Sequence, residues 1–199
     1  MTYKSYTSYK TYTNPMVQDK KSPGYEKLVV YWLATTIYDL NLEFIRRYIS
    51  KMSRTYDQMH QAARSGKQCL VEGALALSVE SNLKLTSVSR ASYGELLEDY
   101  GDYLREKGLT RWGKDDPRVI AIRRERDLPY KTYKSYKTYT TYMQDPESFV
   151  NLMITLCYKQ GYLMDQLLRS IQDKFVREGG FRENLFKKRT EYRNKQNRP

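Results

Sequence analysis

Residues 145–180 read DPESFVNLMITLCYKQGYLMDQLLRSIQDKFVREGG, and they carry the strongest helix signal in this chain. The stretch opens with Asp145-Pro146-Glu147, which is the order of an N-capping residue, a proline at the first helical position and an acidic first turn. Apolar residues then recur at steps of three, four and seven, as on one face of a helix. They are Phe149, Met153, Leu156, Leu163, Leu167, Ile171 and Phe175. Gly179-Gly180 ends the pattern, so we predict a long helix over 146–176.

The same helical pattern recurs in two earlier segments, 24–52 and 81–107. In each of them apolar or small residues step by three and four, which predicts one buried face. These residues are Val29, Leu33, Ile37, Leu40, Phe44 and Tyr48 in the first segment, and Leu85, Val88, Ser92, Leu96, Tyr100 and Tyr103 in the other. Gly108 directly follows the later segment and is a helix stop signal.

The segment between them is rich in small residues and predicts a crowded central helix. Thr55 and Gln58 have the spacing of a capping box at its start. Gly66 and Gly73 each cost about 1 kcal/mol of helix propensity relative to alanine, so we expect a structural role in which a neighbouring backbone approaches closely. Glu72 lies between apolar neighbours in the sequence, and we expect a partly buried carboxylate with a structural partner. The candidate partners are Arg64, Arg90 and another subunit.

These patterns predict an all-α protein, an up-down four-helix bundle over residues 24–178. Its long basic connection, 111–145, is expected to be partly flexible, although Asp116-Pro117 predicts a short helix that continues to Arg126. A low-complexity tail of Tyr, Lys and Thr, 1–23, precedes the bundle, and a basic suffix, 179–199, follows it. In the tail and in the connection Tyr recurs every third residue, which suits neither an amphipathic helix nor a two-sided strand. We therefore expect both Tyr tracts to be flexible or extended.

The excess of positive charge is confined to the segments outside the four long predicted helices. The chain has 199 residues, 40% hydrophobic, and a formal net charge of +12. Residues 22–110 hold 11 basic and 11 acidic residues, and 146–176 hold three of each. The excess lies in 1–21, 111–145 and 177–199, with net charges of +3, +4 and +5. Such blocks favour contact with phosphate backbones, and alternating Tyr and Lys suits single strands. Alternatively, the basic segments only keep a neutral core soluble, and the Tyr tracts are neutral repeats.

The candidate nucleic-acid contacts are the clustered cations of these segments, with weaker candidates on the bundle surface. The clusters are Arg123, Arg124, Arg126, Lys187, Lys188, Arg189 and Arg193, and the weaker candidates are Arg46, Arg47, Arg64 and Lys67. RNA is the expected partner ahead of DNA. A second hypothesis is a protein–protein scaffold that forms a homo-oligomeric ring without contacting nucleic acid. In that case the suffix folds onto a partner as an amphipathic helix through Phe181, Leu185, Phe186 and Tyr192.

No pattern in the chain predicts catalysis, a cofactor or a metal site. His60 is the only histidine, and Cys69 and Cys157 fit no metal or redox spacing. Glu95, Asp99 and Asp102 share a helix face, but a Mg²⁺ nuclease would need further ligands, so pairing with Arg105 or a neighbouring subunit is preferred. The first ten residues, MTYKSYTSYK, lack the apolar core of a signal peptide, and no apolar run has membrane length. We therefore expect a cytoplasmic, non-enzymatic protein without a membrane partner.

Two stretches carry a family resemblance: SRTYDQMHQAARSGKQCLVEGALALS, 53–78, and LTSVSRASYGELLEDYGDYLREKGLTRW, 85–112. Gln61-Ala62-Ala63, Val71-Glu72-Gly73 and Glu95-Leu96-Leu97 in them resemble the bacterial four-helix-bundle proteins related to the 23S ribosomal RNA intervening-sequence proteins. The branch with a C-terminal suffix is the most similar, through EGGFRENLFKKRTEYRNK.

The resemblance covers about residues 24–112 and 146–195. It implies an up-down bundle, assembly as a homopentamer, and a role as an accessory protein. More distantly, the chain is similar to the accessory variability determinants of diversity-generating retroelements, which implies RNA and a reverse transcriptase or other nucleic-acid enzyme as partners. It implies no catalytic residue. The N-terminal Tyr tract and the long basic connection depart from the family pattern.

Overall fold

The computed structural model describes residues 24–126 and 138–196, and every regular element within them is helical. The elements are η1 (Gly24–Lys27), α1 (Val29–Tyr48), α2 (Arg54–Leu75), α3 (Val79–Lys107), α4 (Pro117–Arg124), η2 (Thr140–Met143), α6 (Pro146–Glu178) and α7 (Phe181–Gln196). The predicted all-α class is therefore confirmed. Within the described ranges, no helix is both long enough and apolar enough to cross a membrane.

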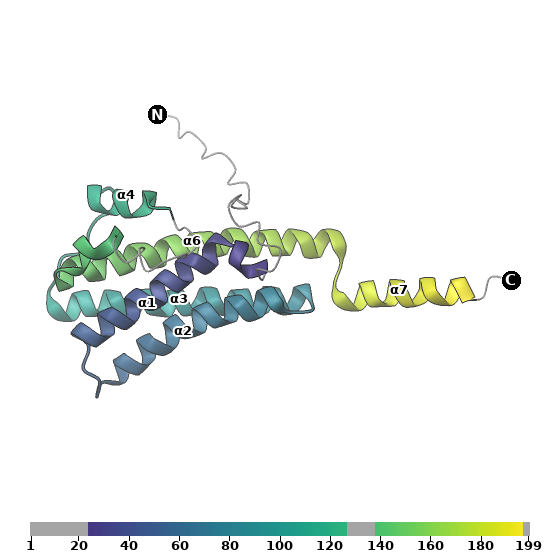
Figure 1. Cartoon of the computed structure of the whole chain (residues 1–199), viewed down its shortest axis with the longest axis horizontal. Helices are drawn as coiled ribbons and strands as arrows, with labels where there is room; N and C mark the ends of the chain where they lie inside the picture. Colours follow the sequence, from purple (N-terminus) through teal and green to yellow (C-terminus); the bar gives the residue numbers. More distant parts are fainter. Residues whose placement is uncertain (1–23, 127–137, 197–199) are drawn as a thin grey trace, which may run out of the picture.

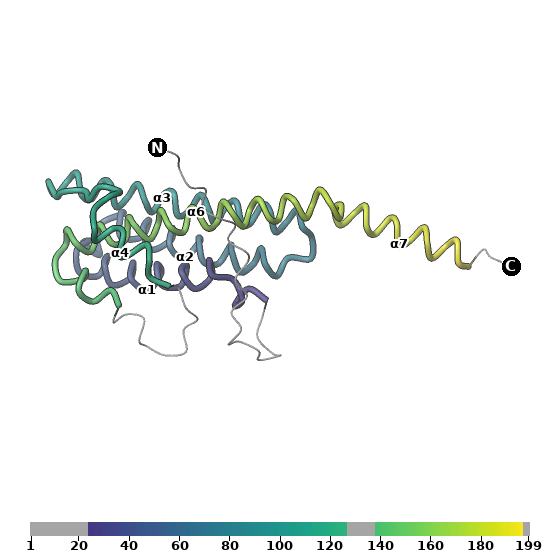
Figure 2. The backbone as a smooth tube through the Cα atoms, turned by 90° about the horizontal axis from the view of Figure 1, so that it is seen from above, coloured from purple at the N-terminus to yellow at the C-terminus, as the bar shows by residue number. Residues whose placement is uncertain are grey.

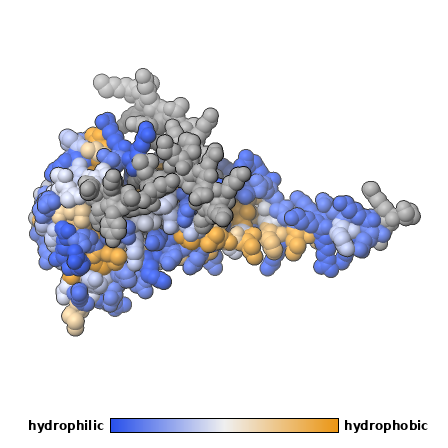
Figure 3. All heavy atoms as spheres, viewed as in Figure 1, coloured by the Kyte–Doolittle hydropathy of each residue, from blue (hydrophilic) through white to orange (hydrophobic). Residues whose placement is uncertain are grey.

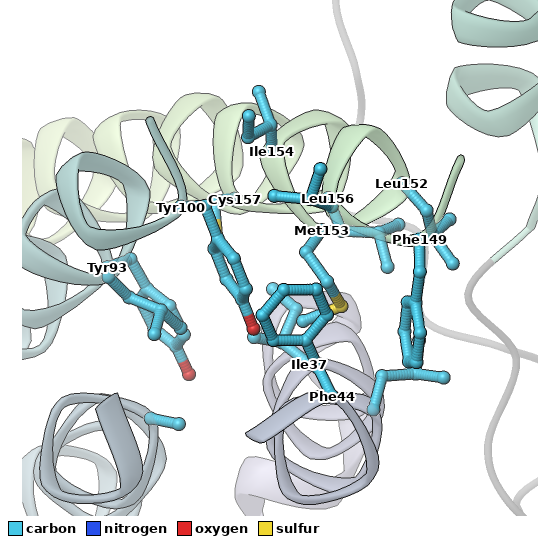
Figure 4. Close-up of a cluster of buried hydrophobic side chains, with 14 of the residues drawn as sticks. Ile37, Phe44, Tyr93, Tyr100, Phe149, Leu152, Met153, Ile154, Leu156 and Cys157 are labelled. Atoms are coloured by element: carbon cyan, nitrogen blue, oxygen red, sulfur yellow. The ribbon is translucent and has the colours of Figure 1, made fainter. Parts of the chain in front are cut away.

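Helices α1, α2, α3 and α6 pack side by side around one core (Figure 1). α2 packs against α1 and α3, and α6 packs against the same two helices on the other side. The ring of Phe44 on α1 lies at the centre, with its centroid 5.0 Å from that of Tyr100 on α3 and 5.3 Å from that of Phe149 on α6 (Figure 4). Aromatic edges and faces from three helices thus meet in the interior.

The predicted helix signals act at the predicted places, with one exception. The Asp145 carboxylate accepts a hydrogen bond from the backbone N–H of Ser148 at 2.8 Å and begins α6, and Gly108 ends α3 with a φ of 62°. The predicted start of α2 was wrong: its N-cap is Ser53, whose hydroxyl accepts from the backbone N–H of Thr55. The capping-box spacing at Thr55 therefore lies inside the first turn of α2.

Burial corrects two expectations about the helix faces. The side chain of Val88, expected on the buried stripe of α3, is 42% exposed. The most deeply buried helix is α6 and not α2, because residues 149–157 are buried without interruption. This part of α6 is covered by α1, α3, α4 and η2, so no side of it faces solvent.

Of the three residues of α2 with an expected structural role, two lie in close contacts and one does not. A Cβ atom added to Gly66 would lie 2.8 Å from Cζ of Tyr93, and one added to Gly73 would lie 3.1 Å from Oδ1 of Asn82. Glu72 is exposed in the single chain, so the expectation of a partly buried carboxylate is wrong within one subunit, and a contact with another subunit stays a prediction. The residues adjacent to it in sequence point to other sides of the helix, and the nearby Leu75 is itself 61% exposed.

Two buried tyrosines on α3 differ in how their hydroxyl groups are satisfied. The Tyr100 hydroxyl donates a hydrogen bond of 2.7 Å to Oδ1 of Asn41, whose Nδ2 donates to the backbone carbonyl of Met59. The Tyr93 hydroxyl is buried and has no hydrogen-bond partner. Burial raises the pKa of both phenols.

Both described ends of the basic connection are folded onto α6. Nδ2 of Asn151 on α6 donates a hydrogen bond of 2.9 Å to the backbone carbonyl of Thr110. Oδ1 of the same side chain accepts one of 2.8 Å from the backbone N–H of Trp112. The last part of the second Tyr tract corrects the expectation of a flexible or extended segment, because Tyr139 is buried and η2 forms a helical turn. The first tract, 1–21, and residues 127–137 lie outside the described residues.

Candidate nucleic-acid interface

α7 is a basic helix that extends beyond the rest of the molecule (Figures 1 and 2). None of its 16 residues is buried. It carries six Lys and Arg residues against two Glu residues, a net charge of +4. At 1.5 Å per residue it is about 24 Å long. A binding partner can therefore reach its basic side chains from nearly every direction.

The start of α7 is fixed to the body of the protein at one point. Gly179 breaks α6 with a φ of 75°, a conformation that favours glycine. The backbone N–H of Phe181 donates to Oε1 of Glu80 on α3 at 3.2 Å, and that of Gly180 donates to Oε2 of Glu183 at 3.1 Å. These carboxylates satisfy N–H groups at the helix start that would otherwise lack partners.

The spacing of residues on α7 sorts its side chains into two neighbouring lines. Arg182, Arg189 and Arg193 are separated by seven and four residues, so they share one side of the helix, with Phe186 between them in the same line. Phe181, Leu185 and Tyr192 form the adjacent line, and their side chains are 48%, 54% and 63% exposed. Arginines beside exposed aromatic rings match a surface that pairs with phosphates and stacks with bases.

The second predicted cluster lies at the end of α4, far from α7. Arg123, Arg124 and Arg126 are exposed. Next to them, Nζ of Lys159 on α6 donates to the backbone carbonyl of Glu125 at 2.7 Å. About 30 Å of α6 separates Lys159 from the start of α7, at 1.5 Å per residue. The two predicted clusters are therefore separate, and one ligand contacts both only if it runs along α6.

The weaker candidates on the helix surfaces join neither cluster. Arg46 and Arg47 both pair with Glu43, and Nη1 of Arg47 also donates to the carbonyl of Met143 at 2.9 Å. Burial opposes ionisation of Glu43, but hydrogen bonds from the two arginines outweigh it and lower the pKa of this carboxyl. Nζ of Lys67 lies 4.6 Å from the centroid of the Tyr38 ring, and Arg64 is exposed on α2.

The acidic residues of α3 form an exposed to half-buried group. Asp102 pairs with Arg105 at 2.7 Å, which is the partner expected from their spacing. Burial, and then the negative charges of Asp102 and Glu95, raise the pKa of Asp99. In the part of the chain that the structure describes, no group of three or more His, Cys, Asp or Glu side chains is arranged to hold a metal ion.

Sequence reasoning missed a cleft beside α4. Its volume is about 410 Å³, and its walls include Trp112, Arg118 and Tyr142. The Arg118 guanidinium carbon lies 3.6 Å from the Trp112 ring centroid, and two hydrogen bonds to Asp116 hold it there. These hydrogen bonds lower the pKa of Asp116. Trp112 and Tyr142 are 30 positions apart and belong to different motifs, so no local pattern links them.

Comparison with known proteins adds no assignment, because no family model, curated protein or solved structure matches this chain.

Proposed function

We propose that this chain is a non-catalytic, nucleic-acid-binding accessory protein of the bacterial cytoplasm, with RNA as its preferred partner and α7 as its main contact. The observation that carries the proposal is α7 itself, a helix with a net charge of +4 and no buried residue. In this proposal α1, α2, α3 and α6 form an up-down four-helix bundle that presents α7. A reverse transcriptase or other nucleic-acid enzyme would act on the bound RNA.

The chemistry of α7 supports phosphate contact. Arg182, Arg189 and Arg193 stand on one side of the helix, and each guanidinium group offers several N–H donors in a planar fork that matches phosphate oxygens. Neutralising phosphates releases counterions, so binding is expected to weaken steeply as the salt concentration rises. The exposed Phe186 and Tyr192 add surfaces on which unpaired bases stack, which favours single strands.

Point variants on α7 test this proposal. Arg189→Gln/Arg193→Gln is compared with Lys51→Gln/Lys107→Gln, a control that removes the same charge from exposed positions away from α7. Affinity is measured by fluorescence anisotropy with a labelled single-stranded RNA over a salt series. Each phosphate that is no longer neutralised is expected to reduce the slope of log affinity against log salt by about 0.7. Equal decreases in affinity for the two double variants would mean that net charge, and not α7, determines binding.

The alternative function, a protein scaffold in a homo-oligomeric ring, has its own supporting observation. Apolar side chains are exposed at the α2–α3 turn and around the α6–α7 junction, where Figure 3 shows a hydrophobic band. Leu77 is 94% exposed, Val176 81% and Phe186 71%. Exposed apolar patches of this kind often mark interaction surfaces.

The oligomeric state separates this alternative from the main proposal. Light scattering on nuclease-treated protein would give a fixed ring, of five copies by the family resemblance, if the scaffold hypothesis holds. Leu77→Asp and Val176→Asp would then dissociate the ring without changing helix content. RNA binding that persists in the dissociated protein would favour the nucleic-acid function.

A further inference from the structure

A stripe of exposed side chains follows the solvent side of α6 between the two basic clusters. Tyr158, Tyr162 and Arg169 are separated by four and seven residues, so they share one side of the helix. Tyr158 is 47% exposed, Tyr162 is 51% exposed, and Arg169 is also exposed. α6 packs against α4 and continues to the start of α7 (Figures 1 and 2). The stripe therefore lies on the route between the two clusters.

The first end of the stripe is joined to the cluster at the end of α4. The backbone carbonyl of Glu125, which lies within this cluster in the sequence, accepts a hydrogen bond of 2.7 Å from Nζ of Lys159. Lys159 directly follows Tyr158, so the cluster lies beside the first turn of the stripe. Nη2 of Arg111 donates to the Tyr158 hydroxyl at 2.6 Å, and its guanidinium carbon lies 5.7 Å from the ring centroid. A further cation thus stands next to the first ring.

The charges along this part of α6 cancel. Residues 160–178 hold three acidic and three basic residues. Asp165 pairs with Arg90 on α3 at 2.9 Å, and Asp173 lies one turn before Arg177. The stretch therefore offers a ligand its exposed rings more than its charge. Phosphates would be neutralised mainly at its two ends, by the cluster on α4 and by α7.

Exposed tyrosine rings between two basic clusters match the way in which proteins hold an unpaired strand. In such sites a basic surface follows the backbone, and bases stack on aromatic rings or on arginine guanidinium planes. The bases of a duplex already stack on each other, so the stripe favours a single strand. An apolar protein surface would also cover the two rings, but it would leave the basic clusters at both ends unpaired.

From this arrangement we infer that one unpaired RNA strand lies along α6 from the cluster on α4 to α7, with bases stacked on Tyr158 and Tyr162 and a phosphate paired with Arg169. The inference rests on the proposed function and adds to it a path and a strand length. About 30 Å separates Lys159 from the start of α7, and stacked nucleotides advance by about 3.4 Å each. A stacked strand therefore needs about nine nucleotides to bridge the clusters, and a more extended strand needs fewer.

Strand length and variants of Tyr162 test the path. Fluorescence anisotropy is measured with labelled uridine oligonucleotides of about four and about sixteen nucleotides. The long strand reaches both clusters and is expected to bind more tightly than the short strand, which reaches only one. Tyr162→Ser is expected to weaken binding of the long strand about tenfold, as for the loss of one stacked base, and to affect the short strand little. Tyr162→Phe keeps the ring and is expected to restore most of the affinity.

Two further variants complete the design. Val88→Ser removes an apolar side chain that is 42% exposed on α3, outside the path, and is expected to leave RNA binding unchanged. Arg124→Gln/Arg126→Gln removes charge from the cluster on α4, and it is expected to weaken binding of the long strand but not of the short strand, which α7 holds. Circular dichroism and light scattering report the helix content and the oligomeric state of each variant.

The results separate the path on α6 from the proposed role of α7. Equal affinity for the two strands, or wild-type binding of the long strand by Tyr162→Ser, would overturn the path even if α7 variants still reduced the affinity. A changed oligomeric state of Tyr162→Ser with unchanged RNA binding would assign the stripe to a protein interface and refute the inference. Conversely, if Tyr162→Ser weakens binding and Arg189→Gln/Arg193→Gln does not, the contact on α6 stands and α7 is not the main contact.

Discussion

The two buried tyrosines of α3 provide a matched test of the interior. Tyr100 and Tyr93 are seven residues apart on one helix, and both side chains are at most 1% exposed. Only Tyr100 has a hydrogen-bond partner, the Asn41 side chain at 2.7 Å. Replacing each tyrosine with phenylalanine removes a single oxygen atom and leaves the ring in place. The two variants therefore differ in the hydrogen bond and not in the packing of the ring.

The structure gives opposite expectations for the two variants. Tyr100→Phe leaves Oδ1 of Asn41 buried without a donor, which costs about 1–3 kcal/mol of folding free energy. For a chain of this size, each kcal/mol lowers the melting temperature by about 2–4 °C. Tyr93→Phe removes a hydroxyl group that has no partner, so its effect is expected to be neutral or stabilising by up to about 1 kcal/mol.

Urea titrations followed by circular dichroism measure both free energies of unfolding on the same scale. The account predicts that Tyr100→Phe is the less stable variant by at least about 1 kcal/mol, with an unchanged dependence on urea concentration. Equal destabilisation of the two variants would contradict the reasoning. A destabilised Tyr93→Phe beside an unaffected Tyr100→Phe would reverse the assignment of the hydrogen bonds.

Further predictions concern the glycines, the acidic group of α3 and the support of the cleft. Gly66→Ala places a Cβ 2.8 Å from Tyr93 and is expected to destabilise the chain, whereas Gly101→Ala meets nothing within 4 Å and should stabilise it by up to about 1 kcal/mol in thermal melts. Asp99→Asn should raise the melting temperature by about 2 °C at pH 7. The pKa of Asp99 is higher in the folded chain than in the unfolded chain. Protonated Asp99 therefore contributes its full stabilisation below about pH 4, and this contribution is lost as the pH rises through the folded-state pKa. The advantage of the variant should therefore disappear at acid pH. Asn151→Ala removes three hydrogen bonds, two of them to residues 110 and 112, and should increase amide exchange in this segment without unfolding α6.

Helix ends could be predicted from the sequence because their signals are local. Asp145-Pro146 and Gly108 act through the backbone within one turn, so no knowledge of the neighbouring helices was needed. Burial was harder to predict, as Glu72 and Val88 show. Whether a residue on a helix is covered depends on where the next helix lies, and that is decided by contacts between distant segments.

In the candidate site too, features with a local sequence signal could be predicted, and features that depend on packing could not. The clusters on α4 and α7 were visible as charge blocks, because charge adds up along the sequence regardless of fold. The pairing of Arg46 and Arg47 with Glu43 is also local, at three and four residues, but the bond from Arg47 to Met143 is not. The cleft joins Trp112 to Tyr142 only after α4 and η2 have packed on α6, so it could not be predicted from spacing.

Deletion of residues 179–199 shows whether α7 makes the main contact with nucleic acid. Because α7 has no buried residue, the shortened chain is expected to keep its helices and its melting temperature. Binding of a labelled single-stranded RNA is then measured for both chains from low to high salt. The account predicts weaker binding at every salt concentration and a shallower salt dependence, by about 0.7 in slope for each phosphate that α7 neutralises in the full chain. An unchanged affinity and an unchanged slope in the folded, shortened chain would contradict it.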